Sequence, residues 1–304
     1  MYLLQKIEDF TSICHDARGI IGQYVLEQRD RLKDASIDQV AAACHTSKPT
    51  VVRFAKALGF QGWREFHREF LQAIAYDDAH LDDVDINYPF QKGDGIPVIT
   101  RNLAHVQQQA VEETMRLLDD EILQRAAQRI LKARRTVIFA ISPNTYLAEI
   151  FRRKLMMIGI YVHVAQSEEM GINALQLGEQ DCAVMISYSG NRKESEPMRY
   201  LPILERKKVP LIGITSAGDN SIRQVSDCVL TMASREHLYA KISSFATEAS
   251  LMYLLNALYS AVFEHDYDRH LNYKLHESRL LERRRYDGME SGAGYPPAKE
   301  EDKQ

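Results

Sequence analysis

Residues 181–190 read Asp181-Cys182-Ala183-Val184-Met185-Ile186-Ser187-Tyr188-Ser189-Gly190. A short apolar run without polar alternation is typical of a strand that is buried on both faces, as in a parallel sheet. The run ends in two serines and a glycine, which are turn-forming residues. This stretch therefore predicts a central parallel strand that opens into a polar loop.

Similar apolar runs lie on either side of this strand. Counting the central run itself, the predicted strands cover 136–141, 161–165, 183–187, 211–215 and 228–232. Each gap has room for one helix, for example 144–158 or 194–207. Two amphipathic helices at about 98–117 and 120–133 precede the strands, and an apolar helix at about 242–264 follows them. Strands that alternate with helices predict a doubly wound, mainly parallel five-stranded α/β domain.

The rest of the chain differs in composition from this domain. Residues 1–75 show helical periodicity alone, which predicts an all-α domain. Residues 76–95 are acidic and contain Pro and Gly, so we expect a linker there. The α/β domain with its preceding helices should then span 96–281. Residues 282–304 are rich in charge, Gly and Pro, and we expect a disordered tail.

Bulk properties exclude several classes of protein. The 304 residues carry a formal net charge of −4, so no global field attracts the chain to nucleic acid or to a membrane surface. No apolar run approaches the roughly 18 residues of a transmembrane helix, and the N-terminus has charges where a secretory signal has its apolar core. The four cysteines lie far apart, so we expect reduced thiols in a cytoplasmic protein.

Residues 36–60 predict two short helices joined by a tight turn. Ser36 is a good N-cap for the first helix, and residues 45–47 form the turn. Ser47 is positioned to cap the second helix, Pro49 is tolerated in its first turn, and Gly59 ends it. The inward stripe of the second helix is Val51, Phe54, Ala55 and Leu58. This pattern is that of a helix-turn-helix, whose second helix enters the major groove of DNA.

The charge of this region supports DNA binding. Between Cys44 and Arg68 there are five basic residues and one acidic residue, a net charge of +4. Clustered cations supply the phosphate-binding part of DNA affinity. The alternative is a small packing or dimerisation domain whose basic face is merely solvated. The residues that we expect to contact DNA are Ser47, Lys48, Thr50, Arg53 and Lys56.

Hydroxyl-rich loops follow three of the predicted strands. In doubly wound sheets, ligands bind outside the carboxyl ends of the strands. Hydroxyls, a glycine and a helix N-terminus together make a cradle for a phosphate. No Gly-x-Gly-x-x-Gly fingerprint is present, so a phosphorylated polyol fits better than a nucleotide cofactor; the alternative is that these residues serve as helix caps and turns. The candidate ligand-binding residues are Ser142, Asn144, Ser187, Ser189, Gly190, Asn191, Arg192, Thr215, Ser216 and Ser221.

Two motifs carry a resemblance to a known family. Ser187-Tyr188-Ser189-Gly190 is similar to the Ser-x-Ser-Gly motif of the sugar isomerase (SIS) domain. Residues 50–54 and 58–62 resemble the helix-turn-helix of RpiR-family bacterial transcription regulators, and the resemblance covers about residues 1–265. It implies a dimeric or tetrameric cytoplasmic regulator that binds operator DNA and senses a phosphosugar. By the same resemblance, Ser187, Ser189 and Thr215 hold the phosphate, with Ser221 nearby.

The chain departs from the family pattern at two positions. The family usually has Gly-x-Gly-x-Ser after the first strand, whereas residues 140–144 read Ala-Ile-Ser-Pro-Asn, so Asn144 stands where a ligand-binding serine is expected. Arg192 replaces the threonine expected two residues after Gly190. An arginine would strengthen an anion site, but the altered loop would equally suit a chain that has lost phosphosugar binding.

Two other classes of function compete with a sugar-controlled regulator. An aldose–ketose phosphosugar isomerase needs a general base, for which Glu248, His237 and His265 are candidates. Alternatively, Glu248 accepts a ligand hydroxyl or lies on the helix surface, and the histidines are surface residues. The third class is a DNA-binding scaffold without a ligand. Because a DNA-binding domain is a poor addition to a metabolic isomerase, we expect a regulator, not an enzyme, with no cofactor and no metal.

Overall fold

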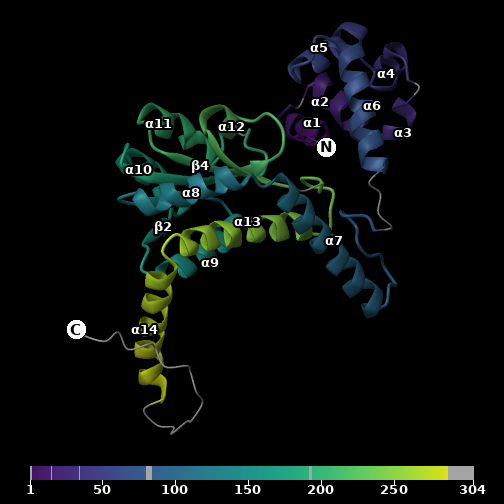
Figure 1. Cartoon of the computed structure of the whole chain (residues 1–304). Coiled ribbons are helices and arrows are strands. Elements are labelled where there is room, and N and C mark those ends of the chain that lie inside the picture. The colour runs from purple at the N-terminus through teal and green to yellow at the C-terminus, as the bar shows by residue number, and fades with distance from the viewer. Residues whose placement is uncertain are drawn as a thin grey trace, which may run out of the picture.

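The computed structural model describes residues 2–14, 16–33, 35–79, 84–191, 194–233 and 235–286. A helical N-terminal domain is followed by a larger α/β domain, and the last helix projects away from the body of the molecule (Figure 1). Among the described residues, no helix combines the length and the apolar character that crossing a membrane requires.

The N-terminal domain is all-α, as predicted. The helices among its described residues are α1 (Tyr2–Ile13), α2 (Ala17–Glu27), α3 (Arg29–Leu32), α4 (Ile37–Ala43), α5 (Lys48–Ala57) and α6 (Trp63–Ala79). The predicted stripe of α5 is confirmed, because all four of its apolar residues are buried among α1, α2 and α6. Phe54 lies edge-on to Phe66 with ring centroids 5.2 Å apart. Gly59 ends the helix with φ of +87°.

The C-terminal domain is a parallel five-stranded sheet among helices, as predicted. The strand order is β2-β1-β3-β4-β5, and every neighbouring pair is parallel. Its elements are α7 (Ile96–Leu117), α8 (Asp120–Lys132), β1 (Thr136–Phe139), α9 (Asn144–Met156), β2 (Val162–Val164), η1 (Ser167–Glu169), α10 (Met170–Gln176), β3 (Cys182–Ile186), η2 (Met198–Tyr200), α11 (Leu201–Arg206), β4 (Leu211–Ser216), α12 (Ser221–Val225), β5 (Cys228–Met232), α13 (Phe245–Glu264) and α14 (Tyr267–Tyr286).

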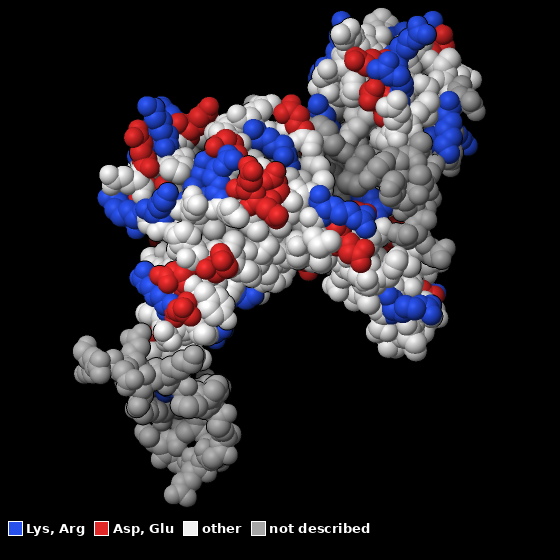
Figure 2. Space-filling model, in the orientation of Figure 1, with Lys and Arg blue, Asp and Glu red and all other residues white. Residues whose placement is uncertain are grey.

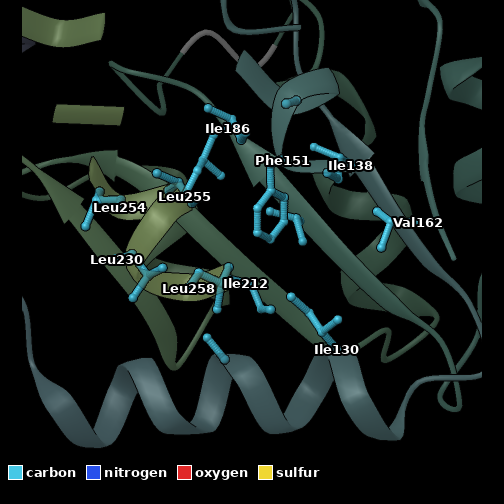
Figure 3. Close-up of a cluster of buried hydrophobic side chains, with 14 of the residues drawn as sticks. Ile130, Ile138, Phe151, Val162, Ile186, Ile212, Leu230, Leu254, Leu255 and Leu258 are labelled. Carbon is cyan, nitrogen blue, oxygen red and sulfur yellow. The ribbon is translucent and has the colours of Figure 1, made fainter. Parts of the chain in front are cut away.

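Helices bury both faces of this sheet. On one face, Ile138, Ile186 and Ile212 pack against α8, α9 and α13 (Figure 3). On the other face, Phe139 and Met185 pack against α10, α11 and α12. Because successive side chains of a strand point to opposite faces, strands covered on both sides are apolar throughout.

Two expected boundaries, of the helix at 194–207 and of the C-terminal tail, differ in the structure. The single helix predicted for 194–207 is reduced to η2 and α11, because a residue that precedes proline disfavours helical backbone and Pro197 lies inside this segment. The helix α14 runs through the first residues of the expected tail, whereas 287–304 lie outside the described residues.

The expected linker is also partly ordered. Residues 76–79 belong to α6, and Val84 and Ile86 pack against Val106 and Ala246 of the α/β domain. The acidic composition with Pro and Gly predicts a linker, but apolar residues alternate with acidic ones there and pack on an apolar surface. Residues 80–83 lie outside the described part of the chain.

Candidate functional site

The strand order fixes where a ligand can bind. The chain adds β2 on one side of β1 and β3, β4 and β5 on the other, so the strand order reverses between β1 and β3. In this 2-1-3-4-5 arrangement the crevice opens outside the carboxyl ends of these two strands. Phe139 of β1 pairs with Met185 of β3, so Ser142 and Ser187 leave the sheet from neighbouring strands a few residues further on. The topology therefore brings the first two predicted loops to one edge of the sheet.

The turn after β3 has a defined hydrogen-bond pattern. The Gly190 N–H donates to Ser187 Oγ at 3.3 Å, and the Ser216 N–H donates to the Tyr188 carbonyl at 3.0 Å. Ser187, Ser189 and Asn191 are half-buried. Within the described part of the chain, the Ser189 hydroxyl has no hydrogen-bond partner, so it is available to a ligand.

Gly190 is required at this turn by geometry. Its φ is +63°, which L side chains rarely adopt. A Cβ atom at this position would lie 2.7 Å from the Asn220 side chain and 2.9 Å from Thr215 Oγ1. The glycine thus lets the turn after β3 pack directly onto the loop after β4.

The loop after β4 supports the turn instead of lining it. Thr215 is completely buried; its hydroxyl donates to the Tyr188 carbonyl at 3.1 Å and accepts from Asn220 Nδ2 at 3.1 Å. Ser216 and Ser221 are also buried, and the Ser221 N–H donates to the Gly190 carbonyl at 3.1 Å. These three predicted residues therefore hold the shape of the site from behind.

Two residues that sequence reasoning missed complete this support. Asn220 caps α12 by accepting the Arg223 N–H at 3.2 Å, while its amide group reaches Thr215. The Arg223 guanidinium donates to the Ser216 carbonyl at 3.1 Å and to Thr231 Oγ1 at 2.6 Å. Burial lowers the pKa of Arg223. An asparagine directly before a short helix is an N-cap signal that would have indicated Asn220.

The loop after β1, which departs from the family pattern, is held by a hydrogen bond within the loop itself. Thr145 Oγ1 donates to the Ala140 carbonyl at 3.0 Å. Ser142 is exposed, and Asn144 is the first residue of α9, which has no side-chain N-cap bond. The N–H groups of Thr145 and Tyr146, at the start of α9, donate to the Ile141 carbonyl at 3.3 Å and to the Pro143 carbonyl at 3.0 Å. The remaining predicted residue of this edge, Arg192, lies outside the described residues.

Glu248 lies in another group of charges. It is on the first turn of α13, where burial and the nearby carboxylate of Glu236 raise its pKa, against an opposing effect of Lys241. Of the other candidate bases, His237 contacts the helical domain, and His265 follows the end of α13. Among the described residues, no group of three or more His, Cys, Asp or Glu side chains is arranged to hold a metal ion.

The N-terminal domain presents a polar, mostly exposed side of α5. Ser47, Lys48, Arg53 and Lys56 are exposed, and basic side chains are visible on this domain (Figure 2). Lys48 Nζ lies 2.6 Å from Asp38 Oδ1 in a pair that is more than half exposed. Such exposed pairs contribute about 0–1 kcal/mol, so Lys48 is readily released to a phosphate.

Two expectations for this helix need correction. Ser47 is at the N-cap position, but its hydroxyl contacts Thr50 Oγ1 at 2.9 Å and bonds no helix N–H. Thr50 is buried, and its hydroxyl accepts from Arg53 Nη2 at 2.9 Å. Thr50 therefore orients Arg53 and is not itself presented to DNA in this conformation. Ser36 forms the complete capping box with Gln39.

Comparisons with known proteins agree with this architecture. The helix-turn-helix domain of the rpiR family matches residues 1–77, and the SIS domain matches residues 129–258, so together they cover more than half of the chain. The chain belongs to the RpiR family. This RpiR-family chain is 22% identical over 284 residues to an HTH-type transcriptional regulator of Caldanaerobacter subterraneus subsp. tengcongensis, covering 93% of this chain and 98% of that protein. It is 24% identical over 269 residues to one of Haemophilus influenzae, covering 88% and 91%.

Solved structures share the fold of this RpiR-family chain. The Vibrio vulnificus NanR protein, complexed with ManNAc-6P, superposes with a TM-score of 0.58 at 18% identity over 92% of this chain and 97% of NanR. The sugar isomerase domain of the RpiR transcription factor from Sphaerobacter thermophilus gives 0.52 at 17% identity, over 62% of this chain and all of that domain (100%).

Proposed function

We propose that this chain is a transcriptional regulator that binds operator DNA through α5 and is controlled by a phosphorylated sugar or amino sugar in the SIS domain. The observation that carries the proposal is the turn after β3, at the switch point of the sheet. There the Ser189 hydroxyl has no hydrogen-bond partner among the described residues, and Gly190 is required by the close approach of Asn220. The same chain also presents an exposed recognition helix with Lys48, Arg53 and Lys56.

The proposed ligand contacts follow from this geometry. Ser187, Ser189 and Asn191 form the turn after β3, and the loop between β1 and α9 brings the exposed Ser142 from the neighbouring strand. Hydroxyl and N–H donors without a buried acid are suited to a phosphate. Arg192 follows this turn in the sequence, and we propose that its cation binds the phosphate. We propose that Glu248 accepts a hydrogen bond from a sugar hydroxyl.

A thermal-shift screen tests ligand binding. The full chain is incubated with sugar phosphates and amino-sugar phosphates, with ManNAc-6P first because the NanR complex contains it. A ligand that binds only the native state raises stability by about 2.7 kcal/mol at one hundred times its Kd. The free sugars and inorganic phosphate are the matched controls. No shift with any sugar phosphate would contradict the proposed control by a phosphosugar.

The same incubation separates a regulator from an isomerase. The proposal assigns Glu248 to a sugar hydroxyl and no catalytic step; its charged neighbours Glu236 and Lys241 come from the loop before α13. Product analysis of the bound sugar phosphate should show no aldose–ketose conversion. Turnover that is lost in Glu248→Gln would assign the chain to the enzyme class.

We also propose that the regulator acts as a homodimer or homotetramer in the cytoplasm. A groove between α8 and α13 is lined by Leu118, Leu123, Tyr253 and Ala257, and Met115 and Leu117 are exposed beside it at the end of α7. A dimer presents two recognition helices to two half-sites of an operator. Light scattering at micromolar concentration should give twice or four times the mass of 34.8 kDa, and a monomer alone would contradict the proposal.

A further inference from the structure

The loop 235–243, between β5 and α13, joins the two domains. The Glu8 carboxylate of α1 contacts His237 Nδ1 and accepts the Leu238 N–H at 2.6 Å. On the other side of the same ring, Arg29 Nη2 of α3 lies 3.2 Å from His237 Nε2. Glu8 is only 9% exposed, and a buried carboxylate needs hydrogen-bond partners such as these from the loop. Figure 1 shows α1 at the end of the helical domain that faces the α/β domain.

The partners of His237 determine its tautomer. A guanidinium only donates hydrogen bonds, so Nε2 must accept from Arg29. Nδ1 then carries the proton and donates to Glu8. One tautomer of the imidazole therefore satisfies both contacts, so that His237 accepts a hydrogen bond from Arg29 and donates one to Glu8, both of the helical domain.

The loop is also held by Asn87 of the expected linker and by the start of α13. Asn87 accepts the His237 N–H at 2.7 Å through its side chain and the Ile242 N–H at 2.9 Å through its carbonyl. The completely buried Glu236 accepts the Ala246 N–H at 2.5 Å, so the loop is tied to the start of α13. Glu248, which the proposed function assigns to the sugar, lies on that same first turn.

We propose that loop 235–243 is a latch that docks the helix-turn-helix domain on the SIS domain and transmits sugar-phosphate binding from the start of α13 to it. This inference rests on the proposed function, because transmission requires a ligand. The exposed side chains of Lys48 and Arg53 are outside the latch contacts, so the latch sets the orientation of the recognition helix and does not block it. Two helix-turn-helix domains of an oligomer, each held at a fixed orientation, can match the half-site spacing of an operator.

The docking part is tested by mutating one domain and observing the other. Trp63, the single tryptophan of the chain, lies in the helical domain, so its fluorescence reports the unfolding of that domain. His237→Ala removes the latch from the SIS side. In guanidinium chloride, the Trp63 transition of this variant should move to lower denaturant, with the unfolding equilibrium constant raised about tenfold, as expected for loss of a hydrogen bond to a charged group.

The matched control is His276→Ala, which removes an exposed histidine of α14 and should leave the Trp63 transition unchanged. Glu8→Gln, combined with His237→Ala in a double-mutant cycle, guards against a folding defect of either variant alone. Non-additive effects on the Trp63 midpoint support the latch. An unchanged Trp63 transition in His237→Ala, or strict additivity in the cycle, would overturn it without affecting the proposed function.

Transmission of ligand binding to the helical domain is tested with the sugar phosphate found in the screen, with ManNAc-6P as the first probe. In the wild type, this ligand should raise the Trp63 midpoint although it binds in the other domain. In His237→Ala, circular dichroism should still show stabilisation of the SIS domain, while the Trp63 transition should no longer respond. An equal Trp63 response in both proteins would overturn transmission through the latch. Absence of binding in the wild type would contradict the proposed function instead, and the docking result would stand.

Discussion

At the scale of single residues, Gly190 holds the candidate site in shape. Gly190→Ala would place a methyl group 2.7 Å from Asn220 at a φ of +63°. We expect a loss of about 2–3 kcal/mol in the free energy of unfolding, together with loss of ligand binding, since the turn must move away from Asn220. Denaturant unfolding and the thermal-shift assay measure the two effects.

Gly178→Ala is the matched control for this prediction. A Cβ atom at Gly178 meets nothing within 4 Å, and this turn lies at the opposite end of β3. Stability and ligand binding should therefore change little in the control. If Gly190→Ala were as harmless as Gly178→Ala, the close packing of the two loops would not matter for the site.

Asp181, at the start of β3, gives a pH-dependent prediction. Burial tends to raise its pKa, but hydrogen bonds from Arg135, Arg134 and the Gly178 N–H outweigh this and lower it. A lowered folded-state pKa contributes stability above the unfolded value of about 3.9, and that stability is lost as the pH falls through the folded-state pKa. Asp181→Asn should therefore cost about 2 kcal/mol at pH 7 and progressively less in acid.

The measurement is urea unfolding of wild type and Asp181→Asn at several pH values from 7 downward. The two curves should converge as the wild-type carboxyl becomes protonated. Glu179→Gln removes an exposed carboxylate two residues away and serves as the control. A difference between Asp181→Asn and wild type that stays constant down to acidic pH would show that packing, and not charge, is responsible.

At the scale of elements, most of the fold could be predicted from the sequence. All five strands were found within one or two residues, because a buried parallel strand is a short apolar run with polar ends. The prediction of a single helix at 194–207 was wrong, because the residue before Pro197 disfavours helical backbone despite the helical periodicity of the segment. In the site, the Ser187–Gly190 turn could be identified. The burial of Thr215 could not, since it depends on how the loop after β4 packs against Tyr188 of the turn after β3.

The turn between α4 and α5 contains a strained residue. His45 has φ of +48° and is exposed, so it occupies a conformation that favours glycine. His45→Gly should raise the free energy of unfolding by about 0.5–1 kcal/mol, as relief of the strain exceeds the added entropy of the unfolded chain. Thr46→Gly, at the next position, should destabilise the protein. Trp63 fluorescence in denaturant measures both, and a loss of stability in His45→Gly would contradict the argument.

The start of α5 gives a prediction for DNA binding. Lys48→Ala combined with Arg53→Ala should weaken binding to a duplex selected from a random pool. It should also reduce the slope of log affinity against log salt by about 2, since each lost phosphate contact releases about 0.9 fewer ions. Lys274→Ala with Arg279→Ala on α14 makes the same change in net charge away from the helix. An unchanged salt slope in the folded α5 variant would exclude α5 as the phosphate-binding helix.

At the scale of the whole molecule, the contacts between domains were beyond sequence reasoning. His237 lies 229 residues from Glu8 along the chain, and no local pattern pairs them. The same is true of Asn87, which reads as part of an acidic linker but is buried beside the loop 235–243. Such contacts depend on how two independently patterned domains meet, so periodicity and turn chemistry carry no information about them.

The last prediction concerns the control of DNA binding by the SIS domain. A ligand shifts the arrangement of the two domains only to the extent that it binds one arrangement more tightly than the other. The Ser189 hydroxyl, in the turn after β3, has no hydrogen bond to the helical domain among the described residues. Ser189→Ala should therefore abolish most of the effector response while the affinity for operator without effector stays within about twofold, a change of about 0.4 kcal/mol.

Operator titrations with and without the sugar phosphate, in wild type and Ser189→Ala, measure this response. Ser195→Ala, at an exposed serine beyond the turn, is the control for loss of a hydroxyl. If Ser189→Ala responded to the effector as the wild type does, the ligand would bind away from the switch point. If it lost affinity for the operator without effector, Ser189 would act on the domain arrangement itself. Only a selective loss of response assigns Ser189 to the ligand.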